Sequence, residues 1–159
     1  MSLFDLLTKD RKDYVGSVVD LKERYRVDEK MAYDGVPTVY YDIVDHKTKK
    51  KVGSIDLRLT NEGDMYYYGN IGYNVLPEMR GNNYAYHACK LLFEVARDEF
   101  HMDELIITCS PENTASYKTL QKLDGELLEL VDVPEGHALY ALGEKSKYIF
   151  RYKISLWRK

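Results

Sequence analysis

The sequence is poor in cysteine, in long apolar stretches and in excess charge of either sign, and each shortage excludes a class of protein. Its two cysteines, Cys89 and Cys109, lie in apolar stretches without a CxxC neighbour, so we expect reduced core residues and no metal site. No run approaches the roughly 18 apolar residues of a membrane-spanning helix, so we expect no membrane association. The formal net charge of -3 argues against a nucleic-acid partner, which favours a basic surplus.

The opening residues, Met1–Asp5, have neither the basic region nor the apolar region of a secretory signal. Together with the reduced cysteines, this predicts a cytoplasmic protein. The chain has 159 residues, of which 45% are hydrophobic and 31% charged, so it can bury a core of its own. We therefore expect a single domain over residues 1–159. The 15 tyrosines favour a fold rich in half-buried strands.

Short apolar runs and polar turns predict a series of strands. Val36–Asp45 and Val52–Leu59 are two extended runs joined by a polar turn, which is the pattern of a β-hairpin. A weak signal for a helix covers residues 3–13. The other expected strands are Ser17–Leu21, Met65–Leu76, Leu105–Cys109, Leu127–Val133 and Tyr148–Leu156.

Two helices are expected in the second half of the chain. Apolar residues recur at helical spacing between residues 83 and 100, and Asn113 is the expected N-cap of a helix that ends before Gly125. The element order predicts an α/β (α+β) fold, with a mixed, mostly antiparallel twisted sheet and flanking helices. The crossover through the long helix should place Met65–Leu76 and Leu105–Cys109 side by side as a central parallel strand pair.

The segment that precedes the long helix offers a site for phosphate groups. Arg80, Gly81, Asn82 and Asn83 lie between the end of a strand and the first turn of the helix. Unpaired amides and the helix dipole favour an anion there, and glycine lets a ligand approach the backbone closely. Arg80 adds a fixed positive charge. From these residues alone, an ordinary turn before a helix explains the pattern equally well.

The same segment resembles a family motif. Arg80–Ala85 is similar to the coenzyme A pyrophosphate loop of the GNAT acetyltransferase superfamily, R/Q-x-x-G-x-G/A, with Asn83 in place of a glycine of that pattern. Gly72–Glu78 resembles the family's fourth strand. Pro111–Ser116 resembles the N-x-x-S helix of the branch that contains ribosomal-protein N-terminal acetyltransferases. The resemblance covers Ile71–Gly125 and implies the GNAT fold.

The resemblance implies acetyl-CoA as the acyl donor and no metal. The pyrophosphate would bind the amides of residues 81–85, and the pantetheine arm would lie along the strand that ends at Leu76. The implied cofactor-binding residues are Val75, Leu76, Arg80, Gly81, Asn82, Asn83, Tyr84, Ala85, Asn113 and Ser116.

The family's usual general acid, a Tyr seven residues after Asn113, is Leu120 in this sequence. The resemblance then implies Ser116 as the catalytic acid, with its neighbour Tyr117 as a substitute. For each of the two residues, a purely structural role is an alternative to catalysis. A helical serine hydroxyl often bonds a backbone carbonyl, and Tyr117 could serve in packing.

The general base is left open. Many relatives carry a Glu just before Ile-Gly on the fourth strand, where this chain has Asn70. Asp56 and Glu78 are the candidates, and a water relay or a neutral acceptor would remove the need for a base. His87, near the start of the long helix, fits a surface or packing role better than catalysis.

The expected function is acetyl-CoA-dependent transfer of an acetyl group to a primary amine of a small molecule or a protein N-terminus, by direct attack. The alternative is a non-catalytic acyl-CoA-binding or sensory module on the same fold. A nucleotide-binding domain is disfavoured, because no Walker Lys-Ser/Thr or GxGxxG is present. Tyr66–Tyr68 are candidates to line an acceptor cleft, and Tyr148–Leu156 either pairs across a homodimer or closes the sheet.

Overall fold

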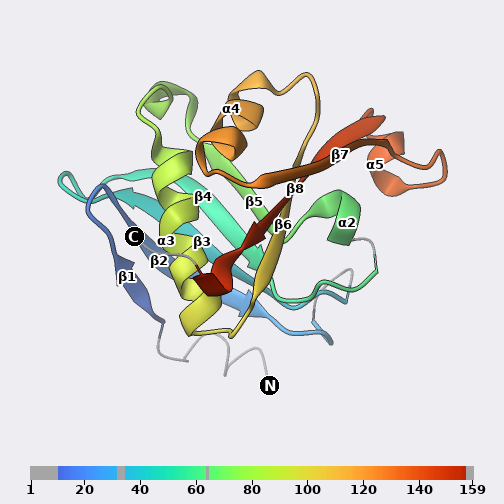
Figure 1. Ribbon diagram of the computed structural model, residues 1–159. Helices are drawn as coiled ribbons and strands as arrows, with labels where there is room; N and C mark the ends of the chain where they lie inside the picture. The colour runs from blue at the N-terminus through green and yellow to red at the C-terminus, as the bar shows by residue number, and fades with distance from the viewer. Residues whose placement is uncertain (1–10, 32–34, 64, 157–159) are drawn as a thin grey trace.

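The computed structural model describes residues 11–31, 35–63 and 65–156. The strands form two sheets, a five-stranded one in the order β1-β2-β3-β4-β5 and a three-stranded one in the order β6-β8-β7 (Figure 1). They are β1 (Asp13–Val15), β2 (Val19–Val27), β3 (Thr38–Asp45), β4 (Lys51–Arg58), β5 (Ile71–Val75), β6 (Glu104–Cys109), β7 (Glu126–Asp132) and β8 (Ser146–Lys153). The helices are α2 (Met65–Tyr68), α3 (Tyr84–Asp98), α4 (Thr114–Lys122) and α5 (Ala138–Ala141), with 3-10 turns at Pro77–Met79 and Ile154–Leu156. None of these helices is long and apolar enough to cross a membrane.

The predicted hairpin is confirmed as β3 and β4. The strands pair antiparallel, with Val39 opposite Leu57 and Tyr41 opposite Ile55, and all four side chains are buried. They share one face because successive side chains of a strand point to opposite sides. That face joins the core beneath α3, whereas the other face carries half-buried polar residues such as Asp56.

The two predicted helices are also confirmed. α3 lies across one face of the five-stranded sheet (Figure 1). Its buried residues, among them Ala88, Leu92 and Val95, recur at the spacing of one helix face and join the core formed by the hairpin. α4 begins after Asn113, whose side chain accepts a hydrogen bond from the backbone N–H of Ser116 at 3.1 Å, as expected of an N-cap.

The expectation of one strand over Met65–Leu76 is wrong for its first part. Met65–Tyr68 forms the single turn α2, and the Gly69 N–H donates to the Met65 carbonyl at 2.7 Å. Gly69 has a φ of +77°, and a Cβ there would lie 3.0 Å from the Ile106 carbonyl oxygen. Close approach to a strand distant in sequence therefore ends the extended run. The three tyrosines of α2 consequently do not alternate across a sheet, and β5 begins at Ile71.

The first and last elements also differ from expectation. The predicted helix over residues 3–13 lies mostly outside the described residues, and Asp13–Val15 pairs with β2 as a strand. β2 continues past Leu21 to Val27, because its second half still pairs with β3. β8 (Ser146–Lys153) begins two residues before the predicted strand Tyr148–Leu156 and ends three residues before its end, where a 3-10 turn follows.

The mixed α+β class is confirmed, but the central parallel pair is not a continuous ladder. β5 is the edge of one sheet and β6 the edge of the other, and each ladder among the described strands is antiparallel. The two strands meet at Asn70, whose backbone N–H donates to the Ile106 carbonyl at 2.6 Å. Beyond that contact they diverge towards α4 (Figure 1). The sheets therefore join at one point and separate on the side of α4.

The Asn70 side chain completes this joint. Its Oδ1 accepts from the Ile106 N–H at 2.8 Å. Its Nδ2 donates to the carbonyls of Thr60 and Arg58, at 2.9 and 3.2 Å. Asn70 is fully buried. An amide suits this position because it both donates and accepts, whereas a carboxylate would accept only.

Replacing Asn70 by Ala should destabilise the fold strongly. The change leaves one buried N–H and two carbonyls without their partner, so we expect a loss of about 3 kcal/mol in the free energy of unfolding. Urea denaturation measures it. Asn74→Ala, at an exposed position of the same strand, should change stability by less than about 0.5 kcal/mol. Equal losses in the two variants would contradict the role of Asn70.

Candidate functional site

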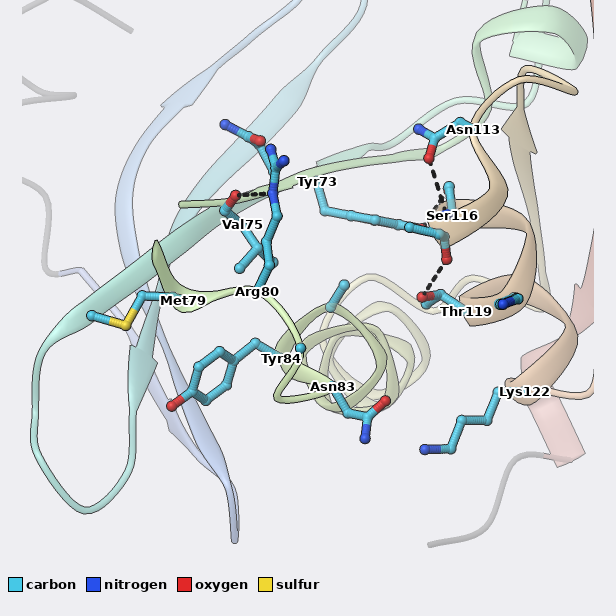
Figure 2. Close-up of a pocket in the computed structure, with 15 residues that line it drawn as sticks. Tyr73, Val75, Met79, Arg80, Asn83, Tyr84, Asn113, Ser116, Thr119 and Lys122 are labelled. Atoms are coloured by element: carbon cyan, nitrogen blue, oxygen red, sulfur yellow. Dashed lines mark hydrogen bonds between the residues drawn. The ribbon is translucent and has the colours of Figure 1, made fainter. Parts of the chain in front are cut away.

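A cavity of about 540 Å³ opens where the two sheets separate. The end of β5, the loop after it, the first turn of α3 and one face of α4 form its walls (Figure 2). Most residues implied as cofactor ligands line it, namely Val75, Arg80, Gly81, Asn83, Tyr84, Ala85, Asn113 and Ser116. Leu76, Asn82 and Tyr117 are not part of the lining.

The loop between β5 and α3 forms part of the cavity wall. Gly81 and Asn83 have φ angles of +89° and +58°, so the chain turns through two left-handed residues before the helix. No carbonyl accepts a hydrogen bond from the N–H groups of residues 81–86 in the described part of the chain. These amides lie at the positive end of the α3 dipole, which is the arrangement that binds anions. Asn82 braces the loop, since its Nδ2 donates to the Met79 carbonyl at 3.0 Å.

Three cationic side chains surround the same opening. Arg80 lies beside the loop and donates from Nε to the Val75 carbonyl at 3.3 Å. Lys118 and Lys122 come from α4. Lys122 extends towards Asn83 across the mouth of the cavity (Figure 2), with its Nζ 4.4 Å from the centre of the Tyr86 ring. The mouth therefore suits a ligand with several negative charges.

A pair of hydroxyls lies deeper, between β5 and α4. The Tyr73 hydroxyl and Ser116 Oγ are 2.7 Å apart (Figure 2). Burial raises the pKa of Tyr73 above its ordinary value of about 10, and hydrogen bonds with Ser116 and Thr119 offset part of that effect. The phenol is therefore protonated at neutral pH and available as a proton donor. Asn113 fixes the backbone of Ser116 through the cap.

Tyr73 was not among the residues expected in the site. The sequence places it on a strand, and only alternation gives its direction, because Ile71, Tyr73 and Val75 share one face. That face meets α4 only once the two sheets have separated. Tyr117, the alternative to Ser116, lies elsewhere, with its ring centre 4.7 Å from that of Tyr148 and 5.8 Å from that of Phe150.

Other expected residues also have structural contacts. Leu76 donates its backbone N–H to the Val52 carbonyl at 2.9 Å, which continues the pairing with β4. The Tyr84 hydroxyl donates to Asp45 Oδ2 at 2.6 Å and so joins the start of α3 to the β3–β4 turn. His87 lies on α3 beside a second, smaller cavity of about 230 Å³, and burial lowers its pKa.

The two candidate bases occupy different environments. Glu78 is exposed in the 3-10 turn after β5. Asp56 lies on β4 and is half-buried, and burial raises the pKa of its carboxyl, while Arg58 and the Gly72 amide lower it. Neither side chain lines the cavity itself.

A family model described as an acetyltransferase (GNAT) domain matches residues 6–126. No curated protein matches the sequence significantly. Among solved structures, a GNAT acetyltransferase from Bacillus anthracis has 20% identity and a TM-score of 0.57, over 72% of this chain and 66% of that one.

Two further solved structures are similar to this chain. A putative ribosomal-protein-serine acetyltransferase from Vibrio cholerae has 20% identity and a TM-score of 0.56, over 73% of this chain and 64% of that one. A microcin C7 self-immunity acetyltransferase, in complex with acetyl-CoA and AMP, has 17% identity and a TM-score of 0.54, over 73% and 61%. At these identities the likeness concerns the fold, and this chain spans less than two thirds of each structure.

The Tyr84 contact leads to a prediction about Asp45. Its pKa is lowered to about 2, first by the hydrogen bond from Tyr84 and then by backbone amides of the turn. Because the folded pKa lies below the ordinary value of about 3.9, the contact stabilises the fold above about pH 4, and the effect disappears as pH falls through about 2. Tyr84→Phe should raise the pKa of Asp45, measured by NMR titration of its carboxyl carbon. An unchanged pKa would contradict the contact, and Tyr86→Phe is the control.

Proposed function

We propose that this chain, which belongs to the GNAT acetyltransferase family, uses acetyl-CoA to acetylate a primary amine of a small molecule or a protein N-terminus. One observation carries the proposal. A single cavity is lined both by the loop at the start of α3, with its unpaired amides, and by the half-buried hydroxyls of Tyr73 and Ser116. A long ligand with phosphates at one end and a reactive thioester at the other would place the phosphates at the loop and the thioester at the hydroxyls.

The residues present suit coenzyme A as a substrate. The pyrophosphate would bind the amides of residues 81–85, with Arg80, Lys118 and Lys122 supplying positive charge. The pantetheine arm would follow β5 into the space where the sheets part, beside Val75 and Asn113. The thioester would then lie near Tyr73 and Ser116. A similar fold was solved in complex with acetyl-CoA, which supports the same donor for this chain.

The chemistry is a direct transfer. A neutral amine attacks the thioester carbonyl, the new C–N bond forms, and the C–S bond breaks as coenzyme A thiolate departs. The thiolate takes a proton from the Ser116 hydroxyl, which recovers one from the Tyr73 phenol 2.7 Å away. Tyr73 regains its proton from the attacking nitrogen through solvent. Tyr117 serves in packing against Tyr148 and Phe150 in this proposal.

A non-catalytic acyl-CoA-binding module is the second candidate. Leu120 and Asn70 stand where many family members carry the acid and the base, and this observation favours it. Both functions require the loop, but only an acetyltransferase requires the hydroxyl pair. The two predictions that follow therefore separate binding from catalysis.

Gly81→Ala should abolish acetyl-CoA binding. An alanine disfavours the φ of +89° and should shift the loop, so the amides of residues 81–85 would lose the arrangement that the proposed anion site requires. Gly35→Ala is the matched control, because Gly35 also has a positive φ of +74° and open space around it, yet lies outside the cavity. Calorimetry with acetyl-CoA and with ATP measures the effect. ATP binding in place of acetyl-CoA, or equal affinity in both variants, would refute the proposed site.

Ser116→Ala and Tyr73→Phe should lower kcat by about 100-fold, the usual effect of losing a proton donor, without weakening acetyl-CoA binding. Thiol release measures kcat, with propylamine and with a peptide that has a free N-terminal alanine as acceptors. Tyr117→Phe and Thr114→Ala, outside the cavity, should retain kcat. Wild-type protein that binds acetyl-CoA but acetylates no amine would favour the non-catalytic module.

A further inference from the structure

The second cavity, of about 230 Å³, lies between α3 and the turn that joins β1 to β2 (Figure 1). One wall is formed by Val15–Val19, and the other by His87, Lys90, Leu91 and Glu94 of α3. These four residues are three or four positions apart along the helix, so they share one of its faces. The linings of the two cavities have no residue in common, so the second cavity is a separate space.

The turn between β1 and β2 is held in place by hydrogen bonds within the protein. The Gly16 N–H donates to Asp20 Oδ1 at 3.1 Å, and the Asp20 side chain is buried. Asp20 also contacts His46 Nδ1 at 2.9 Å and Lys49 Nζ at 3.1 Å, both from the connection between β3 and β4. A wall that is already ordered lowers the entropic cost of binding a ligand.

The same turn covers the middle of α3. A Cβ at Gly16 would collide with the Val19 carbonyl and lie 3.3 Å from Leu91 Cδ2, so the turn and the helix are in close contact. Lys90 and Glu94 lie beside this contact and are half-buried. Their charged groups are therefore partly withdrawn from water, where an ionic contact is stronger than on an open surface.

The cavity attracts negative charge at Lys90. Its Nζ lies 5.2 Å from the centre of the Tyr86 ring. Lys90 forms no ion pair within the described part of the chain. The wall formed by Val15–Val19 contributes no titratable side chain, so nothing on that side offsets the ammonium charge. A ligand carboxylate would form a charge-assisted hydrogen bond there.

His87 supplies a second hydrogen-bond donor. Burial first, and then the charges of Lys90 and Lys122, lower the pKa of its imidazole. The ring is therefore neutral at neutral pH, and one of its nitrogens carries a proton that can be donated. A carboxylate between His87 and Lys90 would offset the positive charge of the lysines, so its binding should raise the pKa of His87.

The remaining lining limits the size and charge of a ligand. Val15, Val18 and Leu91 supply apolar surface, which suits an aliphatic body. A volume of about 230 Å³ corresponds to roughly eight water molecules, and so to a ligand with about eight non-hydrogen atoms. Glu94, four residues after Lys90, repels a second negative charge. This carboxylate disfavours phosphate and dicarboxylates as ligands.

We infer that the second cavity binds a short aliphatic monocarboxylate, with the carboxylate between Lys90 and His87 and the chain against Val18 and Leu91. Hydrogen bonds from the two donors would fix the carboxylate, and burial of the chain would add a hydrophobic contribution. The inference goes beyond the proposed acetyl transfer and does not depend on it, because it concerns a different cavity.

NMR titration of the full chain with 4-methylpentanoate tests this site without any acetyl donor. The ligand should shift the Gly16 amide and the ring signals of His87 in a saturable manner, and should raise the pKa of His87. 4-Methylpentanamide has the same shape without the charge, and we expect it to bind about tenfold more weakly. Inorganic phosphate should leave these signals unchanged.

Two matched variants locate the carboxylate. Lys90→Met keeps an unbranched side chain but removes its charge, and should weaken binding of 4-methylpentanoate about tenfold. Lys118→Met removes a cation from the first cavity instead and should leave this affinity unchanged. Thermal unfolding of both variants verifies that the fold is retained.

Several results would overturn the inference. One is equal affinity for the carboxylate and the amide, and another is equal affinity of the wild type and Lys90→Met for the carboxylate. Loss of binding in Lys118→Met alone would place the carboxylate in the first cavity. Phosphate that shifts the same signals with equal affinity would contradict the ligand class. Because none of these measurements involves acetyl-CoA, the proposed function stands or fails separately.

Discussion

The hydrogen bonds of one buried amide, Asn70, determine the geometry of the candidate site. They join β5 to β6 at Asn70 and Ile106, and the two sheets separate beyond that contact. The cavity exists because that separation is not closed by a ladder, and α4 forms its far wall. The amide neither gains nor loses charge in the ordinary pH range, so a change of pH within that range leaves these hydrogen bonds intact.

The sequence predicts those elements whose signal is local. The β3–β4 hairpin follows from alternation, α3 from helical spacing, and the start of α4 from the Asn113 cap. The loop before α3 can also be predicted from its residues, because glycine and asparagine adopt left-handed conformations that other residues disfavour. These local signals place most of the cavity lining on the correct elements.

Features that depend on contacts distant in sequence could not be predicted in this way. α2 replaces part of a strand because Gly69 packs closely against β6. No local sequence pattern predicts that contact. β5 and β6 meet through Asn70, which the family pattern in the sequence presents only as a missing carboxylate. The place of Tyr73 in the site could not be predicted for the same reason. Its partner Ser116 is 43 residues away, and only the separation of the sheets brings the two hydroxyls together.

β5 is an edge strand, and its two faces therefore belong to different surroundings. Tyr73 points towards α4 on one side, and Gly72 adjoins Asp56 on the other, although the two residues are consecutive. One strand of backbone therefore separates the cavity from the face that carries Asp56, so a shift of β5 that changes one face also moves the wall of the other.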